Sequence, residues 1–176
     1  MMERLDLPRE FPGGTRYGAE EEEAVLRVVR ARSPFRYYGE ACAFEAAALE
    51  REFAAYLEGL GDGAGGTMLA TAVGSGTGAL EVALDALGVG AGDEVITQGF
   101  FWISTVGAIV RCRAVPVLVD SDDTLNLDPV ALVAKVTDRA KVVLPVHMAG
   151  EPTRIGLLME VVRGINRDRA GRGIAP

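Results

Sequence analysis

From residue 67 onward the sequence alternates short apolar segments with helix-like segments of about a dozen residues. The apolar segments predict strands at 67–73, 94–97, 115–119 and 141–148, and the segments that follow them predict helices at 77–87, 102–113, 128–136 and 154–163. Parallel strands can be joined only through a crossover connection, which is usually a helix. The alternation therefore predicts an α/β fold with a mostly parallel sheet covered by helices on both faces.

The chain before residue 67 lacks this alternation, which predicts a separate region. Residues 1–17 carry no hydrophobic period, and helices are expected at 19–32 and 40–58. A loop with five glycines at 59–66 marks the boundary. We expect an arm with two helices at 1–62, a partial α/β domain at 63–163, and an irregular tail at 164–176. Because no strand follows the last predicted helix, the chain is expected to be truncated or to end in non-native sequence.

Charge and hydropathy exclude two classes of partner. The 18 Lys and Arg residues against 25 Asp and Glu residues give a net charge of −7. This argues against nucleic acid as a partner, because a phosphate backbone favours a basic surface. No apolar run approaches the ~20 residues of a membrane span, so we expect a cytoplasmic protein without a membrane partner.

The supply of metal-binding side chains is small. The chain has two cysteines, Cys42 and Cys112, and a single histidine, His147. One histidine cannot supply the ligand set of a zinc hydrolase, so no metal site is expected. Both cysteines are interpreted as buried thiols of a reducing compartment.

Ligands of open parallel sheets bind beyond the carboxyl ends of the strands. The candidate segments are therefore 74–78, 98–102, 120–123 and 147–150. The first, Gly-Ser-Gly-Thr-Gly, runs directly into a helix, and its N–H groups could hold an anion such as phosphate. It lacks the third glycine of a dinucleotide fingerprint and the lysine of a P-loop, so a tight turn that binds nothing stays an alternative.

The other candidates each have two interpretations. Trp102 is either a core aromatic residue or a flat wall for a planar cofactor ring. His147 is either a hydrogen-bonded structural residue or a catalytic group. Asp120, Asp122 and Asp123 are interpreted as loop and turn residues rather than as a metal cluster.

Three segments in order carry a resemblance to a known family: GSGTGALEVALDALGVGAGDEVIT, GFFWISTVGAIVRCRAVPVLVD and LNLDPVALVAKVTDRAKVVLPVHMAGEP. With the upstream RYYG and FEAAALEREFAAYLEG, the chain resembles the DegT/DnrJ-type sugar aminotransferases over about residues 10–163. These are pyridoxal-phosphate enzymes of the type I, aspartate aminotransferase fold. The resemblance implies that Gly76, Thr77 and Gly78 hold the cofactor phosphate and that Trp102 stacks on the pyridine ring. It places His147 near the cofactor without a defined role.

The resemblance also implies residues that this chain lacks. Pyridoxal chemistry needs a lysine that binds the cofactor as a Schiff base and a carboxylate on the pyridine nitrogen, and the family carries both further downstream. The two lysines here, Lys135 and Lys141, match neither position, so no catalytic residue is assigned. Gln98-Gly99 also replaces the Pro-Ser that the family usually has before its aromatic pair.

The expected function is that of an N-terminal fragment of an aminotransferase, inactive by itself. The complete enzyme would take an amino-acid donor and a keto-sugar or keto-cyclitol, with pyridoxal phosphate as its cofactor, and would be a homodimer. Two alternatives stay open: a non-catalytic Rossmann-like phosphate- or nucleotide-binding module, and a degenerate paralogue that only dimerises.

Overall fold

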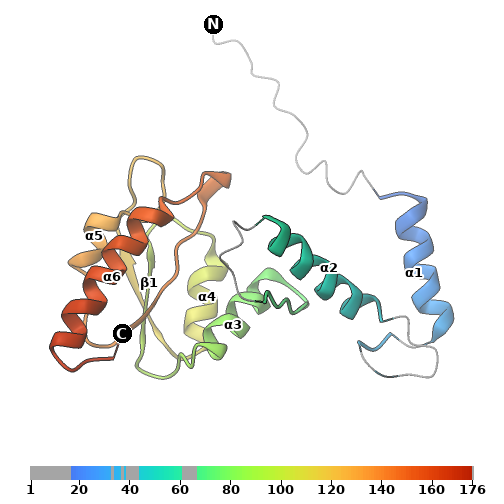
Figure 1. Ribbon diagram of the computed structural model, residues 1–176, viewed down its shortest axis with the longest axis horizontal. Helices are drawn as coiled ribbons and strands as arrows, with labels where there is room; N and C mark the ends of the chain where they lie inside the picture. The colour runs from blue at the N-terminus through green and yellow to red at the C-terminus, as the bar shows by residue number, and fades with distance from the viewer. Residues whose placement is uncertain (1–16, 33, 37, 39–43, 61–66, 176) are drawn as a thin grey trace, which may run out of the picture. The chain divides into compact units, whose positions relative to one another are not determined.

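The computed structural model describes residues 17–32, 34–36, 38, 44–60 and 67–175 (Figure 1). The chain divides into two compact units, Met1–Ala72 and Val73–Pro176. We call them the N-terminal unit and the α/β unit. The boundary between Ala72 and Val73 lies within the strand predicted at 67–73, whereas the boundary expected from the glycine-rich loop lies before that strand, between residues 62 and 63.

The N-terminal unit contains the helices α1 (Ala19–Ala31) and α2 (Glu45–Leu60). Acidic residues in the first turn of α1 and Arg30 in its last turn match the helix macrodipole. The predicted helix at 19–32 is confirmed. The predicted helix at 40–58 is confirmed from Glu45 onward, and residues 40–43 lie outside the described part of the chain.

The strand predicted at 67–73 is wrong. These residues are described, but they form no strand and pair with none of the described strands. Side-chain carboxylates of α2 instead accept hydrogen bonds from backbone N–H groups that strand pairing would otherwise use. Glu58 Oε1 accepts from the N–H of Met68 at 2.8 Å, and Glu50 Oε1 accepts from the N–H of Ala72 at 2.8 Å. An apolar sequence alone cannot supply the neighbouring strand that pairing requires.

The α/β unit contains the remaining described elements in chain order: α3 (Gly76–Ala86), β1 (Glu94–Gln98), α4 (Ile103–Arg111), β2 (Val115–Val119), α5 (Pro129–Val133), β3 (Ala140–Val143), the 3₁₀ turn η2 (Met148–Gly150) and α6 (Ile155–Gly171). The strand order is β2-β1-β3, and both pairings are parallel. The predicted α/β fold with a parallel sheet is confirmed, although the strand predicted at 141–148 ends at Val143.

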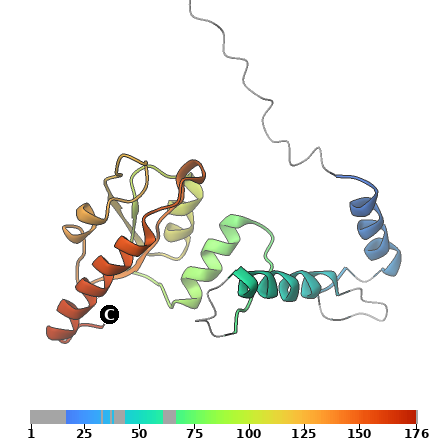
Figure 2. The same ribbon diagram turned by 45° about the horizontal axis from the view of Figure 1, so that its top comes forward.

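The core lies on both faces of the central strand β1, whose five residues are all buried. Side chains alternate along a strand, so neighbouring residues of β1 enter different clusters. Val95 packs with Leu84 of α3 and Ile109 of α4. Ile96 packs with the apolar side chains Leu132 of α5 and Leu158 of α6. In Figures 1 and 2, α3 and α4 accordingly lie on one side of the strands, and α5 and α6 on the other.

The irregular tail predicted at 164–176 is also wrong, because α6 continues to Gly171. Ile165 packs against the core cluster of α5 and α6. The buried guanidinium of Arg169 donates hydrogen bonds to the carbonyl oxygens of Thr137, Asp138, Ala140 and Ala175. The arginines and glycines that suggested a loop therefore belong to a helix that is fixed to the start of β3.

No helix in the described ranges is both long and apolar enough to cross a membrane.

Replacing Ile109 by Ala tests the packing of α4 on β1. Ile109 is fully buried, so the variant should lose about 2–5 kcal/mol of unfolding free energy, measured by urea denaturation. Val110→Ala on the same helix is the matched control, because Val110 is 55% exposed and a surface change should cost only about 0.5 kcal/mol. Equal losses for the two variants would contradict this packing.

Candidate functional site

The carboxyl ends of β1, β2 and β3 lie at one edge of the sheet because the strands are parallel. The N-terminus of α3 lies at the same edge. Its C-terminal end leads into β1 at the opposite, amino edge, where the carbonyl oxygen of Gly88 accepts from Lys141 Nζ at 2.6 Å. The carboxyl edge therefore gathers the turn before α3 and the loops that follow the three strands.

The turn at 74–78 ends in a capped helix N-terminus. Ser75 is the N-cap of the 11-residue α3, and its Oγ accepts from the N–H of Gly78 at 3.0 Å. Gly76 and Thr77 occupy the first two helical positions, where N–H groups have no acceptor within a helix. No acceptor for either N–H occurs among the described residues. Two backbone donors and the hydroxyl of the half-buried Thr77 thus remain available to a ligand.

The space in front of this turn is open. A Cβ atom added at Gly76 would meet no heavy atom within 4 Å, whereas one at Gly78 would come within 3.4 Å of Ser75 Oγ. Packing within the chain therefore does not require glycine at position 76. Free donors, a helix dipole and open space are what a phosphate group needs, so the turn fits such a group.

Trp102 immediately precedes α4 at the same edge of the sheet. Its side chain is 73% exposed, so the core interpretation is wrong and the indole face is accessible. An exposed indole provides a flat apolar surface on which a planar ring can stack.

Two buried carboxamides hold the loops of this edge together, and the sequence did not indicate either role. Gln98, at the end of β1, exchanges two hydrogen bonds with the backbone of Val146 at 2.9 and 3.0 Å and donates to the carbonyl oxygen of Leu125. Asn126 accepts from the N–H of Met148 at 2.9 Å and donates to the carbonyl oxygen of Glu151 at 3.1 Å. Both side chains are fully buried. A buried side-chain amide must find hydrogen-bond partners, and this rule is the one signal that could have pointed to these roles.

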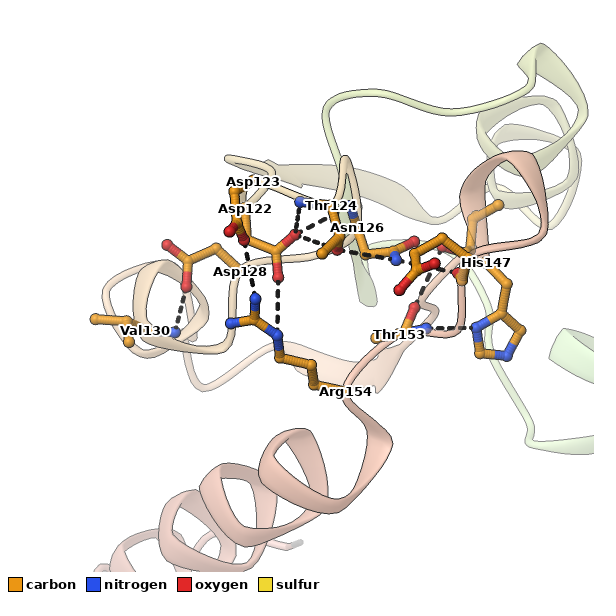
Figure 3. A network of polar contacts seen from close by, with 11 residues as sticks. Asp122, Asp123, Thr124, Asn126, Asp128, Val130, His147, Thr153 and Arg154 are labelled. Atoms are coloured by element: carbon orange, nitrogen blue, oxygen red, sulfur yellow. Dashed lines mark hydrogen bonds and ion pairs between the residues drawn. The ribbon is translucent and has the colours of Figure 1, made fainter.

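Asp122 organises the loop after β2, which confirms its interpretation as a loop residue (Figure 3). Its Oδ1 accepts from the backbone N–H groups of Thr124 at 2.9 Å and Asn126 at 3.3 Å, and from the Thr124 hydroxyl. The Thr124 hydroxyl first, and then these N–H groups and the charge of Arg154, hold the pKa of Asp122 below its ordinary value, against desolvation. Arg154 also pairs with Asp123 at 2.9 Å. No cluster of side chains able to hold a metal ion occurs in the described ranges.

His147 lies four positions after β3, in the loop held by the two carboxamides. Its imidazole is exposed, and Nδ1 accepts from the backbone N–H of Thr153 at 2.9 Å. Figure 3 shows the ring on the side of this network opposite to the pair of Asp122 and Arg154. The side chain therefore makes a structural hydrogen bond through Nδ1, while Nε2 has no hydrogen-bond acceptor among the described residues.

The two lysines lie away from this edge. Lys141 Nζ pairs with Asp93 at 3.0 Å at the amino edge, and Lys135 lies in the connection from α5 into the amino end of β3. Of the two cysteines, Cys112 is half-buried and Cys42 lies outside the described residues.

Comparisons with known proteins agree with this fold. The sequence profile of the DegT/DnrJ/EryC1/StrS aminotransferase family matches residues 18–166. The 3-amino-5-hydroxybenzoate synthase of Amycolatopsis mediterranei is 44% identical over 142 residues, which are 80% of this chain and 34% of that protein. A protein of Streptoalloteichus tenebrarius, named as an L-glutamine:3-amino-2,3-dideoxy-scyllo-inosose aminotransferase, is 49% identical over 92 residues, which are 52% of this chain and 22% of that protein.

A solved structure is also similar. It is described as a sugar aminotransferase of Streptococcus pneumoniae in its PLP form, and it superposes with a TM-score of 0.68 at 30% identity. The match covers 83% of this chain and 35% of that one. The chain thus spans roughly a third or less of each of these proteins.

The charge on Asp122 should make stability depend on pH. A carboxylate whose pKa is lowered by folding stabilises the fold above its ordinary pKa of 3.8, and this contribution is lost as the pH falls through the lower, folded pKa. Asp122→Asn keeps an acceptor oxygen but lacks the charge. The difference in unfolding free energy between wild type and Asp122→Asn, from urea titrations, should therefore be largest near neutral pH and shrink below pH 3.8. Asp123→Asn, at a side chain that is 81% exposed, serves as the control. A difference that does not change with pH would rule out this role for Asp122.

Proposed function

Because the chain belongs to the DegT/DnrJ/EryC1/StrS aminotransferase family, we propose that it forms the N-terminal part of a pyridoxal-phosphate-dependent aminotransferase. The complete enzyme transfers an amino group from an amino-acid donor to a keto-sugar or keto-cyclitol. The observation that carries the proposal is the turn before α3, where Gly76 and Thr77 present free N–H groups to open space. In this enzyme, the part contained in the chain holds the cofactor.

The phosphate of the cofactor is bound at this turn. The N–H groups of Gly76 and Thr77 and the Thr77 hydroxyl donate to phosphate oxygens, and the positive end of the α3 dipole favours the charge. Gly78 contributes differently, because its N–H already donates to Ser75 Oγ. It fixes Ser75, whose hydroxyl hydrogen stays available as a further donor.

The pyridine ring of the cofactor stacks on Trp102. The exposed indole offers one apolar face and excludes water from that side of the ring. When bound, pyridoxal phosphate supplies the electron sink for amino transfer. Gly76, Thr77, Gly78 and Trp102 orient it but transfer no proton themselves.

The chain by itself is proposed to be catalytically incomplete. Covalent capture of the cofactor needs a lysine at the carboxyl edge, and both lysines of the chain lie towards the amino edge. No catalytic residue is therefore assigned to this chain.

The complete enzyme is proposed to be a homodimer, as the family resemblance implies. The helix α1 supports this, because it buries none of its side chains. Its apolar residues Val25 and Val29 are 62% and 65% exposed. A helix of 13 residues is marginal in water unless an apolar face is packed, so α1 is expected to pack against a partner subunit.

A nucleotide-binding module is disfavoured by Gln98. In a dinucleotide-binding fold, an acidic residue at the end of the strand after the first helix binds the ribose. Gln98 occupies that position here, and its amide is fully buried and bonded to the loop backbone. It cannot contact a ribose without releasing Val146.

Removing the Thr77 hydroxyl should weaken cofactor binding. Thr77→Val deletes one hydrogen bond to a charged group, and the dissociation constant for pyridoxal phosphate should rise about tenfold. The quenching of Trp102, the only tryptophan of the chain, measures it directly. Thr67→Val, at an exposed threonine of the N-terminal unit, is the matched control and should bind as wild type. Tighter binding of AMP than of pyridoxal phosphate would contradict the proposed function.

Borohydride reduction tests the incompleteness of the chain. After incubation with pyridoxal phosphate and reduction, mass spectrometry should find no stoichiometric pyridoxyl group on Lys135 or Lys141, because neither lies near the proposed phosphate site. Stoichiometric labelling of either lysine that is abolished by excess inorganic phosphate would show that the chain carries its own cofactor lysine.

A further inference from the structure

The loop that carries His147 is held by three buried polar side chains, those of Gln98, Asn126 and Thr153. The residue before His147 is bonded through both its N–H and its C=O to the buried Gln98 amide. The residue after it donates its N–H to the buried Asn126. Thr153, which is 4% exposed, donates its hydroxyl to the carbonyl oxygen of Val146 at 3.3 Å.

Despite this support, His147 itself is exposed. Two fully buried carboxamides and a buried threonine thus fix the position of a side chain that packs into no core cluster. Support of this kind is what places a polar group for binding to a ligand. The hydrogen bond from the Thr153 N–H to Nδ1 at 2.9 Å fixes the ring orientation as well.

That same hydrogen bond determines which nitrogen carries the proton. An Nδ1 that accepts from an N–H group has no hydrogen of its own, so a neutral imidazole carries its proton on Nε2. Nε2–H is therefore a donor, and no acceptor for it occurs in the described part of the chain. Its position follows from the sheet, because Val146 is bonded to Gln98 at the end of β1, and the loop from Gln98 leads directly to Trp102.

We propose that His147 is a cofactor-binding residue that donates Nε2–H to an acceptor oxygen of pyridoxal phosphate, either on the ring or on the phosphate. This inference rests on the proposed function, because it requires the cofactor at the carboxyl edge. It adds a third contact to those made by the turn before α3 and by Trp102. Gln98, Asn126 and Thr153 are positioning residues that act through His147.

Because His147 is the only histidine of the chain, its ring nitrogens can be followed by long-range ¹H–¹⁵N NMR without assignment. In the pH range where the imidazole of the ligand-free protein is neutral, its proton should be on Nε2. Added pyridoxal phosphate should shift the Nε2 signal saturably, with the same dissociation constant as the quenching of Trp102. Pyridoxal alone reproduces the shift if the acceptor is on the ring, and inorganic phosphate reproduces it if the acceptor is on the phosphate.

The outcomes separate this inference from the proposed function. Quenching of Trp102 without any response of His147 overturns the role of His147 and leaves the proposed function intact. A tautomer with the proton on Nδ1 has the same consequence. Failure of both Trp102 and His147 to respond to pyridoxal phosphate overturns the proposed function, and the inference with it.

Two variants separate binding from loop structure. In His147→Asn the side-chain oxygen can replace Nδ1 as the acceptor for Thr153 while Nε2–H is lost. The affinity for pyridoxal phosphate should then fall about three- to tenfold without a change in the urea midpoint. His147→Gln extends an amide donor towards the position of Nε2 and should retain more of the affinity than His147→Asn. Wild-type affinity in His147→Asn would overturn the inference.

Discussion

The complete burial of β1 between two helix layers is the constraint on which the rest of the α/β unit depends. Val95 and Ile96 point to opposite faces and enter separate core clusters. Because β2 and β3 both pair with β1 in parallel, the direction of this one strand determines where all the following loops emerge. It thereby brings the turn before α3, Trp102 and His147 to the same edge of the sheet.

The polar end of β1 fixes the loops at this edge of the sheet. Thr97 and Gln98 are fully buried, so each must be hydrogen-bonded to avoid a desolvation penalty. Thr97 Oγ1 donates to the carbonyl oxygen of Leu144 at 2.8 Å, and Gln98 is bonded to Val146 and Leu125. The free energy of satisfying two buried side chains is thus what holds the loops after β2 and β3 in place, and the exposed His147 with them.

The sequence predicts those elements whose residue pattern lies within the element itself, and it does not predict those that depend on contacts with distant residues. The strands β1 and β2 and the helices α3 and α4 are predictable because short apolar segments alternate there with helix-like segments of about a dozen residues. The strand predicted at 67–73 does not form, because pairing depends on a neighbouring strand, and Glu50 and Glu58 accept hydrogen bonds from its N–H groups instead. The helical end of α6 was missed because the partners of Arg169 lie about 30 residues earlier, at the start of β3. Pairings over such separations leave no periodic signal in a sequence.

The site shows the same division. The glycine-rich turn and Trp102 stand out as motifs in the sequence, but the roles of Gln98 and Asn126 depend on loops that only the fold brings together. The central claim is that the turn before α3 holds the phosphate of pyridoxal phosphate. Backbone ¹H–¹⁵N NMR of the 176-residue chain during titration with this cofactor tests it most directly. The account predicts that the largest saturable shifts fall on the amides of Gly76 and Thr77. Shifts confined to residues of the amino edge, such as Asp93 and Lys141, would contradict it.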